Sequence, residues 1–449
     1  MKKSKNTIDM THGTLWNKIL LFALPLAASS ILQQLFNSVD TAVVGRFASS
    51  RALAAVGSTS SFISLMINLF IGISLGSNVV IAHYIGQKVE KNIQAAIHTA
   101  ITVALIGGCF VMILGQFIGR PVLILMGTPE DVIDLAVQYL RIYFLGMPFI
   151  LLYDFGSSIL RSTGDSRRPL YSLIVAGVLN TVLNLILVIV FQMGVAGVAI
   201  ATVVSNIVSS GIVMWILMHE PEPVRFTPRK LMINGKELWK ILSIGVPAGL
   251  QGMVFSLANV CIQSTINSFG SDAVAGSAAA LNYEFFAYFI VNAFAQTTVT
   301  FTSQNYGAGE YDRCRKIFRI NMTFSMVFCG LLSAVFVLGR SFFLGLYTTD
   351  ASVLEYATTR LVIATTLELL TSTYEISGGA MRGLGHSLQP ALITVFGSCV
   401  LRLIWISTAC VAVHEFWVLI IIYPISWVVT GIIMIISYLR LRKKMLIKN

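Results

Sequence analysis

The sequence YDFGSSILRSTGDSRRP at residues 153–169 recurs as YEISGGAMRGLGHSLQP at residues 374–390. The two copies align without a gap, at a constant offset of 221 residues, and share the order Tyr, Arg, Gly, Ser, Pro. Asp154 in the first copy aligns with Glu375 in the second, so the acidic character of this position is repeated as well. Self-similarity over so long a distance indicates an internal duplication.

The duplication extends toward the start of each half, where Pro25 aligns with Pro247 at an offset of 222. We therefore expect an N-terminal lobe at residues 1–218 and a homologous C-terminal lobe at residues 237–449. The stretch between them, residues 219–236, is polar and proline-rich, and we interpret it as a cytoplasmic linker.

The composition places the chain in a membrane. Of its 449 residues, 56% are hydrophobic and 11% are charged, whereas a soluble domain has about 45–50% apolar and about 25% charged residues. The charges separate long apolar stretches, and about 20 apolar residues are enough for a helix to cross the hydrocarbon core. Twelve such stretches are predicted, at residues 16–44, 52–85, 93–118, 133–160, 170–191, 195–218, 238–269, 273–304, 317–338, 353–381, 391–413 and 416–439.

These features predict an all-α integral membrane protein with twelve transmembrane helices in two homologous six-helix lobes. Because each lobe has an even number of spans, the repeat is parallel and both lobes have the same orientation. Parallel repeats place a cavity at the repeat interface and suit alternating access. Transport is therefore the first functional hypothesis.

The distribution of basic residues predicts that both termini are cytoplasmic. Most of the 31 lysines and arginines lie in the loops that this orientation places inside. They are Lys2, Lys3, Lys5, Lys18, Lys88, Lys91, Arg161, Arg167, Arg168, Arg225, Arg229, Lys230, Lys236, Lys240, Arg313, Arg315, Lys316, Arg319, Arg382, Arg440, Arg442, Lys443, Lys444 and Lys448. The outside loops hold Arg46, Arg51, Arg120 and Arg340. We expect a multi-pass protein of a bacterial-type plasma membrane, whose net charge of +11 requires no nucleic-acid partner.

The six cysteines show no CxxC or Cys/His spacing. Neither a disulfide framework nor a structural metal site is indicated. No cofactor is expected beyond a coupling ion.

The first span carries a polar stripe that ends in a carboxylate. Gln34, Asn37, Asp40 and Thr41 recur at spacings of three and four residues, which places them on one helix face. An ionisable group at membrane depth is costly and is therefore a functional candidate. We predict that Asp40 exchanges a coupling ion, because a proton or a bound cation would neutralise it. Ile262 stands at the equivalent position of the second half, so only one half carries this carboxylate.

Amides and hydroxyls in the fifth and sixth spans complete the candidate ion site. Asn180 and Asn184 share one helix face, and Thr202 and Asn206 have the same spacing. Their oxygens could bind Na⁺ or hydrogen-bond a protonated Asp40. Alternatively, they could hold helices together, as small polar residues do in membranes.

Further polar residues are expected to line a substrate cavity. They are Gln34, Asn37 and Asp154 in the first half, and Asn259, Glu284 and Glu375 in the second. Arg402 lies mid-span, and Glu375 or Glu368 could be its partner in a buried ion pair. Pro25 lies inside the first span, where the missing backbone hydrogen bond predicts a kink. A change of charge at Asp40 could bend the helix there.

Several motifs resemble the multidrug and toxic compound extrusion (MATE) family. They are Leu24-Pro25-Leu26, residues 34–41 (QLFNSVDT), residues 44–47 (VGRF), residues 53–57 (LAAVG), residues 160–166 (LRSTGDS), residues 194–202 (GVAGVAIAT) and residues 381–385 (MRGLG). The resemblance covers nearly the whole chain. It implies a cation-coupled antiporter that exports amphipathic, often cationic organic compounds through two six-helix lobes.

The resemblance also implies a cation site in the first lobe. The family's site combines an acid matching Asp40, an asparagine matching Asn180, a further acid, and a threonine matching Thr202. Asn184 stands here in place of the further acid. Because one carboxylate binds Na⁺ less strongly than two, the replacement favours H⁺ as the coupling ion and leaves Na⁺ open.

Two rival functions are less favoured by the sequence. A flippase for lipid-linked oligosaccharides has a related architecture, but it is expected to hold pyrophosphate with several buried cations, and only Arg402 is deeply buried in the predicted spans. An integral-membrane enzyme is less favoured, because paired-Asp diphosphate motifs and clustered metal-ligand histidines are missing from the sequence. We therefore expect a non-enzymatic, monomeric transporter whose partners are small organic molecules and the lipid bilayer.

Overall fold

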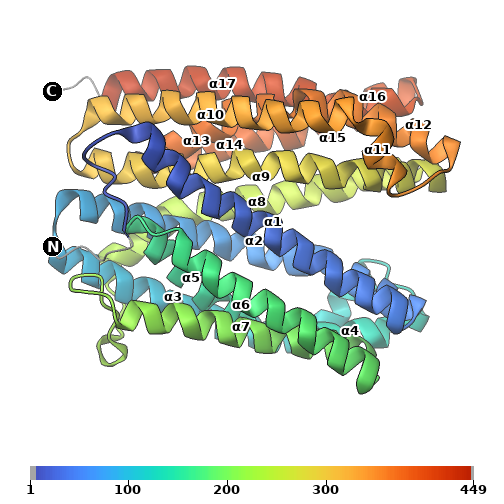
Figure 1. Cartoon of the computed structure of the whole chain (residues 1–449), viewed down its shortest axis with the longest axis horizontal. Coiled ribbons are helices and arrows are strands. Elements are labelled where there is room, and N and C mark those ends of the chain that lie inside the picture. Colours follow the sequence, from blue (N-terminus) through green and yellow to red (C-terminus); the bar gives the residue numbers. More distant parts are fainter. Residues whose placement is uncertain (1–6, 446–449) are drawn as a thin grey trace. The chain divides into compact units, whose positions relative to one another are not determined.

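The computed structural model of the chain describes residues 7–445, which form helices joined by turns and short loops (Figure 1). Lys2, Lys3, Lys5 and Lys448, which contribute to the predicted inside charge, lie outside these residues. The helices of the first half are α1 (Leu15–Phe47), α2 (Ser50–Gln87), α3 (Glu90–Leu125), α4 (Glu130–Leu145), α5 (Met147–Ser162), α6 (Arg167–Asn184), the π-helix η1 (Leu185–Val190) and α7 (Gly194–Met218). The linker contains the short 3-10 helix η2 (Pro228–Lys230).

The second half repeats this series with more interruptions. Its helices are α8 (Gly235–Asn267), α9 (Ser271–Gly307), α10 (Tyr311–Leu338), α11 (Arg340–Gly345), α12 (Ala351–Arg360), η3 (Leu361–Thr365), η4 (Glu368–Leu370), α13 (Thr371–Gly383), α14 (Leu388–Thr394), η5 (Val395–Val400), α15 (Leu401–Ala412), α16 (Phe416–Ile420) and α17 (Ile422–Met445). Of the interruptions, η3 and η5 are π-helices and η4 is a 3-10 helix.

Within residues 7–445, ten helices are long and apolar enough to cross a membrane. The pair α4 and α5, bent by 47°, raises this number to eleven if the pair is one span. The all-helical, multi-span class predicted from the sequence is confirmed. Residues 351–383 are helical throughout, in agreement with the predicted span at residues 353–381, but the helix type changes along it from α12 through η3 and η4 to α13. The ionisable residues Arg360 and Glu368 lie where the helix type changes.

The described chain forms two compact units. Unit 1 contains the chain up to Asp9 together with Ala28–Gly249, and unit 2 contains Met10–Ala27 together with Leu250–Asn449. The divisions therefore fall inside α1 and inside α8, shortly after Pro25 and Pro247. The lobes predicted from the repeat, with boundaries at 218 and 237, follow sequence similarity and stay a prediction.

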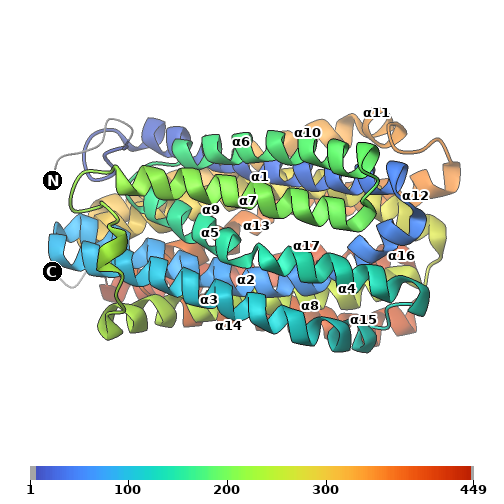
Figure 2. The same cartoon turned by 90° about the horizontal axis from the view of Figure 1, so that it is seen from below.

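In unit 1, α2 packs against α3, α4 and α5, and α7 packs against α4, α5 and α6. Figure 2 shows α6 beside α7 and α2 beside α3. The first part of α8 also belongs to this unit, where Gly249 meets Gly72 of α2. A Cβ atom on Gly72 would lie 2.1 Å from the backbone nitrogen of Gly249. Only glycine permits so close an approach of two helix backbones.

In unit 2, α9 packs against α10, α12 and α13, and α13 packs against α17. The first part of α1 joins this unit through Phe22, whose ring lies edge-on to that of Phe301 with centroids 5.5 Å apart. A large apolar core surrounds Ile262, which is 1% exposed.

The duplicated motif adopts the same backbone turn in both units. In unit 1, Gly164 N donates to Arg161 O at 3.0 Å, and in unit 2, Gly385 N donates to Arg382 O at 2.9 Å. Both glycines have a left-handed backbone, with φ of +98° and +87°. The glycine that recurs in both motif copies is thus explained by a conformation that other residues rarely adopt.

Candidate functional site

Asp40 lies on α1 in unit 1, next to two asparagines of α6. The Asn184 side-chain amide donates a hydrogen bond to Asp40 Oδ1. The same amide nitrogen lies 3.2 Å from Asn180 Oδ1, to which it also donates. Asn180 and Asn184 are buried and Asp40 is half-buried. The structure therefore brings together three of the four residues predicted to bind the coupling ion.

Close packing of α1 on α6 produces this arrangement. A Cβ atom on Gly177 would lie 1.8 Å from Cε2 of Phe36, so only glycine leaves room for this ring. Phe36 lies one turn before Asp40, and Gly177 lies about two turns before Asn184. The close approach thus fixes the distance between carboxylate and amide. The sequence analysis identified neither Gly177 nor Phe36, because their contact depends on how the two helices pack.

Asn184 also marks a change in helix type. It is the last residue of α6, and the π-helix η1 begins at Leu185. π-helical segments are rare and frequently occur at functional sites.

Oxygen atoms at this site remain available to a ligand. The buried Oδ1 of Asn184 has no hydrogen-bond partner among residues 7–445. Buried polar atoms in proteins are generally paired with protein, water or an ion. A carboxylate beside an unpaired amide oxygen suits a proton or a small hard cation.

Thr202 makes a different contact. Its hydroxyl donates to Val198 O of the same helix at 3.0 Å, and Asn206 donates to Thr202 O at 2.8 Å. These bonds stay within α7 and do not join Thr202 to Asp40. A role for Thr202 in ion binding stays a prediction.

The remaining polar residues of the first stripe are accessible. Asn37 and Thr41 are exposed, Gln34 is half-buried, and the Thr41 hydroxyl donates to Asn37 O. Asp154 on α5 is half-buried. Their predicted contacts with substrate stay predictions. Helix α1 continues through Pro25 without ending there, and the predicted kink at this residue stays a prediction as well.

The equivalent face in unit 2 has different chemistry. Asn259 on α8 is exposed, whereas the neighbouring Ile262 is buried in the apolar core. Glu375 on α13 is half-buried and accepts a hydrogen bond from the Tyr288 hydroxyl at 3.1 Å. No carboxylate replaces Asp40 on this helix face.

Glu284, expected to line the cavity, forms a buried ion pair. Arg360 Nε donates to Glu284 Oε1 at 2.7 Å, and Arg360 Nη2 donates to Glu284 Oε2 at 2.9 Å. The third nitrogen, Nη1, donates to Ser277 Oγ at 2.6 Å. Both carboxylate oxygens are thus already engaged, and Arg360 itself is 2% exposed. Arg360 lies inside the predicted span at residues 353–381, so the expectation that only Arg402 would be deeply buried is corrected. Its partner could not be read from the sequence.

The expected ion pair of Arg402 is corrected by the structure. Within residues 7–445 its guanidinium has no carboxylate at ion-pair distance, and Nε donates to Ser426 Oγ at 3.0 Å. The guanidinium carbon lies 4.6 Å from the ring centroid of Tyr423 and 5.3 Å from that of Phe255. Aromatic faces attract buried cations, so rings replace the expected carboxylate.

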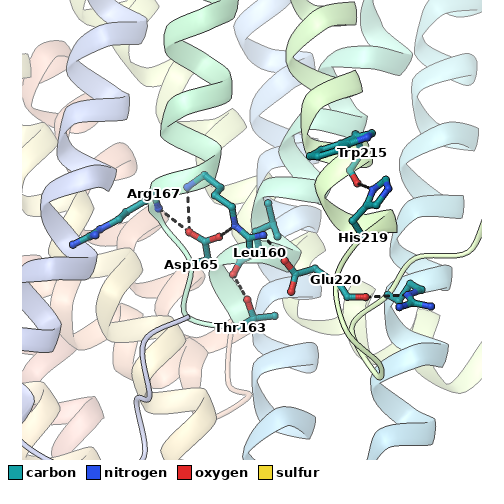
Figure 3. Close-up of polar contacts among 9 residues, drawn as sticks. Leu160, Thr163, Asp165, Arg167, Trp215, His219 and Glu220 are labelled. Atoms are coloured by element: carbon teal, nitrogen blue, oxygen red, sulfur yellow. Dashed lines mark hydrogen bonds and ion pairs between the residues drawn. The ribbon is translucent and has the colours of Figure 1, made fainter. Parts of the chain in front are cut away.

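A third cluster lies at the linker end of unit 1 and was missed as a site in the sequence (Figure 3). Asp165 Oδ1 accepts hydrogen bonds from the backbone nitrogens of Arg167 and Arg168, at 3.0 and 3.1 Å. The Arg168 guanidinium forms ion pairs with both Asp165 and Glu220. Asp165 and Glu220 are 1% and 3% exposed. These ion pairs connect the turn of the first motif copy to the residues that follow α7. In the sequence, the charged residues of this motif copy were the feature that could have indicated the cluster.

Candidate metal ligands do not gather elsewhere. Among the described residues, no three His, Cys, Asp or Glu side chains are placed to hold a metal ion.

Comparison with known proteins identifies the family. The MatE family model matches the chain twice, over residues 25–186 and 247–406, in agreement with the internal repeat. The chain is 32% identical to "Probable multidrug resistance protein YoeA" of Bacillus subtilis, over 88% of this chain and 85% of that protein. It is 31% identical to "Probable multidrug resistance protein YpnP" of the same organism, over 68% of each chain.

The fold agrees with solved structures of the family. The "Crystal structure of MATE in the bent conformation" superimposes with a TM-score of 0.91, covers 99% of both chains, and has 21% sequence identity. These relatives do not favour the flippase alternative. The chain belongs to the MatE family of multidrug and toxic compound extrusion transporters and is a multi-pass integral membrane transport protein.

Proposed function

We propose that this protein is a secondary antiporter that exports amphipathic, often cationic organic compounds in exchange for H⁺ or Na⁺. Two relatives that are more than 30% identical are named as multidrug resistance proteins, which supports the substrate class. The observation that carries the coupling mechanism is the contact of Asp40 with the Asn184–Asn180 pair.

Asp40 is the main coupling carboxylate in this proposal. When it is ionised, it accepts the hydrogen bond from Asn184. When it binds a proton, it loses its charge and can itself donate to the unpaired Asn184 oxygen after the amide turns over. The two states therefore favour different contacts between α1 and α6, which is the differential interaction that a coupled transporter needs.

In this proposal, the change of contacts at Asp40 affects the rest of α1. Asp40 lies in the part of α1 that belongs to unit 1, whereas Pro25 lies in the part that belongs to unit 2. The two residues are about four helical turns apart. A change of contacts at Asp40 can thus alter the helix at the weak point near Pro25, where a backbone hydrogen bond is missing.

The choice of H⁺ rests on the number of carboxylates. Only Asp40 supplies a formal negative charge among the three residues in contact, because Asn180 and Asn184 are neutral amides. One charge crossing 100 mV yields about 2.3 kcal/mol, which supports roughly a 50-fold gradient of a neutral substrate. Proton exchange at one carboxylate therefore suffices for useful efflux.

The proposal also includes the oligomeric state, the membrane orientation and the substrate contacts of the protein. The protein works as a monomer in the plasma membrane with both termini in the cytoplasm, and its lobes divide at the linker. The accessible residues Gln34, Asn37, Asp154, Asn259 and Glu375 contact the substrate. A susceptibility panel in an efflux-deficient host, with and without the protein, identifies the compounds exported.

The test is efflux by everted vesicles that carry Asp40→Asn. We expect drug transport to be lost while membrane insertion and yield match the wild type, because asparagine has the same shape but cannot ionise. Asp134→Asn is the matched control, since Asp134 is an exposed carboxylate on α4 that pairs with Arg120. Unchanged transport by Asp40→Asn would refute the coupling role.

A second measurement distinguishes the ions. Substrate efflux is driven either by a pH gradient without Na⁺ or by a Na⁺ gradient with the pH gradient collapsed. Transport under the pH gradient is expected, and activity under the Na⁺ gradient alone would reject proton coupling.

A further inference from the structure

The linker of unit 1 is fastened along helix α3 by its backbone. Thr227 N donates to His98 Nε2 at 3.2 Å, and Asn234 N donates to Thr99 Oγ1 at 3.1 Å. Thr102 Oγ1 donates to Met232 O at 3.3 Å. The linker therefore has a defined position on α3 and does not swing freely.

This position coincides with the expected edge of the bilayer. The stretch of α3 from Asn92 to Gly119 carries no Asp, Glu, Lys or Arg, and it is bounded by Lys91 and Arg120. At about 1.5 Å per residue it spans about 42 Å, close to the thickness of about 40–45 Å that a bilayer has with its headgroup regions. His98, Thr99 and Thr102 lie about two to three turns inside the cytoplasmic end of this stretch, so we place the linker residues that contact them near the level where hydrocarbon meets headgroups.

The side chains of this segment point away from the protein. Leu231, Met232 and Ile233 are 42%, 51% and 47% exposed, and Trp239 at the start of α8 is 73% exposed. Three consecutive exposed apolar residues are unfavourable in water. Tryptophan is enriched at the membrane interface, where its ring lies at headgroup level.

Cations surround these apolar residues. Arg229, Lys230 and Lys236 are exposed on the same segment, and no acidic residue lies between Pro223 and Lys236. Apolar residues flanked by exposed cations are typical of segments that lie in the interface of an anionic membrane. We define Arg229–Ile233 together with Lys236 and Trp239 as the linker patch.

We infer that the linker patch binds anionic phospholipid headgroups. Leu231, Met232 and Ile233 enter the upper acyl region, while Arg229, Lys230 and Lys236 contact the phosphates. The binding fixes the level of unit 1 in the bilayer. It is independent of the transported compound and of the coupling ion.

The test compares lipid retention by the full chain. The wild type, the triple variant Arg229→Gln/Lys230→Gln/Lys236→Gln and a control are each purified in detergent. Each receives equal amounts of phosphatidylglycerol and phosphatidylcholine, and native mass spectrometry measures the bound ratio. The control, Lys88→Gln/Lys91→Gln/Lys316→Gln, removes three exposed cations outside the linker patch.

The wild type and the control are expected to prefer phosphatidylglycerol. The preference should fall about ten-fold or more in the linker variant, because each basic residue near the surface contributes about 1 kcal/mol. An unchanged preference in the linker variant overturns the inference. Displacement of the lipid by soluble glycerol phosphate at equal concentration also overturns it, since the patch would then recognise the phosphate group alone.

A second measurement tests whether Trp239 lies within the bilayer. Nanodiscs with brominated phosphatidylglycerol are prepared with the wild type and with Trp239→Phe, and the difference in emission isolates Trp239. Quenching of this component by bromine is expected. An unquenched component places the patch in water and overturns the inference, even if every variant folds.

Discussion

The turn that follows α5 and the turn that follows α13 have the same backbone and different side-chain chemistry. In unit 1, Arg168 bridges the buried acids Asp165 and Glu220. In unit 2, the residue aligned with Arg168 is Gln389, which donates to the Ser437 hydroxyl. The duplication preserved the glycine-dependent turn and left its polar partners free to diverge.

The helix faces inside the two units also carry different charged groups. Unit 1 has a carboxylate next to neutral amides, and Ile262 excludes such a carboxylate from the equivalent face of unit 2. Unit 2 instead contains the ion pair of Arg360 with Glu284 and the ring-stacked Arg402. Each unit thus contains a buried ion pair, and the helix face with a carboxylate hydrogen-bonded to neutral amides belongs to unit 1, so we interpret unit 1 as the one that responds to the ion.

The largest effect is expected when a carboxylate is placed in unit 2 at the position equivalent to Asp40. Ile262→Asp places an ionisable group in an apolar core, and we expect a loss of more than about 4 kcal/mol in stability. Yield and Tm in detergent measure the effect. Ile262→Val, the size control, should cost about 0.5–1.5 kcal/mol, and a well-folded Ile262→Asp variant would show that unit 2 can accept the acid.

The second prediction concerns the buried ion pair. Glu284→Gln leaves the Arg360 guanidinium without its counter-charge and should cost about 3–5 kcal/mol. The double variant Glu284→Gln/Arg360→Met removes both charges and should be less destabilised than Glu284→Gln alone. Thermal unfolding of Glu284→Gln, Arg360→Met and the double variant tests this order. Additive losses of stability would mean that the two residues are not coupled.

The third prediction tests the two turns directly. Arg168→Gln copies the residue of unit 2 into unit 1 and leaves Asp165 and Glu220 buried without their cation. We expect a loss of about 1–3 kcal/mol, the cost of unsatisfied buried groups. Gln389→Ala is the counterpart in unit 2 and should have a smaller effect on Tm, because its loss leaves no buried charge. Equal effects would contradict the distinction between the turns.

The smallest expected effect concerns His386, which aligns with Asp165. Desolvation lowers the pKa of His386 below its ordinary value of 6.5, and the charge of Lys444 lowers it further. The unfolded chain therefore takes up this proton more readily than the folded one. The stabilisation by neutral His386 is complete above pH 6.5 and declines as the pH falls below that value.

Tm measured at pH 7.5 and pH 5.5 reveals this contribution. His386→Gln removes one titrating group and should show a slightly smaller drop in Tm than the wild type. An identical drop in both proteins would indicate that His386 does not contribute to the pH dependence.

The repeat and the membrane class could be predicted from the sequence, because both depend on patterns along the chain. The neighbourhood of Asp40, Asn180 and Asn184 was also anticipated, since costly polar groups at membrane depth tend to find each other. Their role in coupling remains a prediction.

Contacts between distant helices could not be predicted in the same way. The pairing of Glu284 with Arg360 and the fit of Phe36 against Gly177 depend on how helices pack. A single sequence does not record that packing. The changes of helix type within residues 351–383 were also not predictable, because hydropathy does not report π and 3-10 turns.

The division of α1 and α8 between the units has a consequence for assembly. The first part of α1 uses Phe22 to contact Phe301 of the second half, and the first part of α8 places Gly249 against Gly72 of the first half. A fragment that ended at the linker would therefore lack the partners of its own first helix. Each unit is therefore completed by a helix segment from the other half of the chain, and neither half of the sequence contains all the residues of one unit.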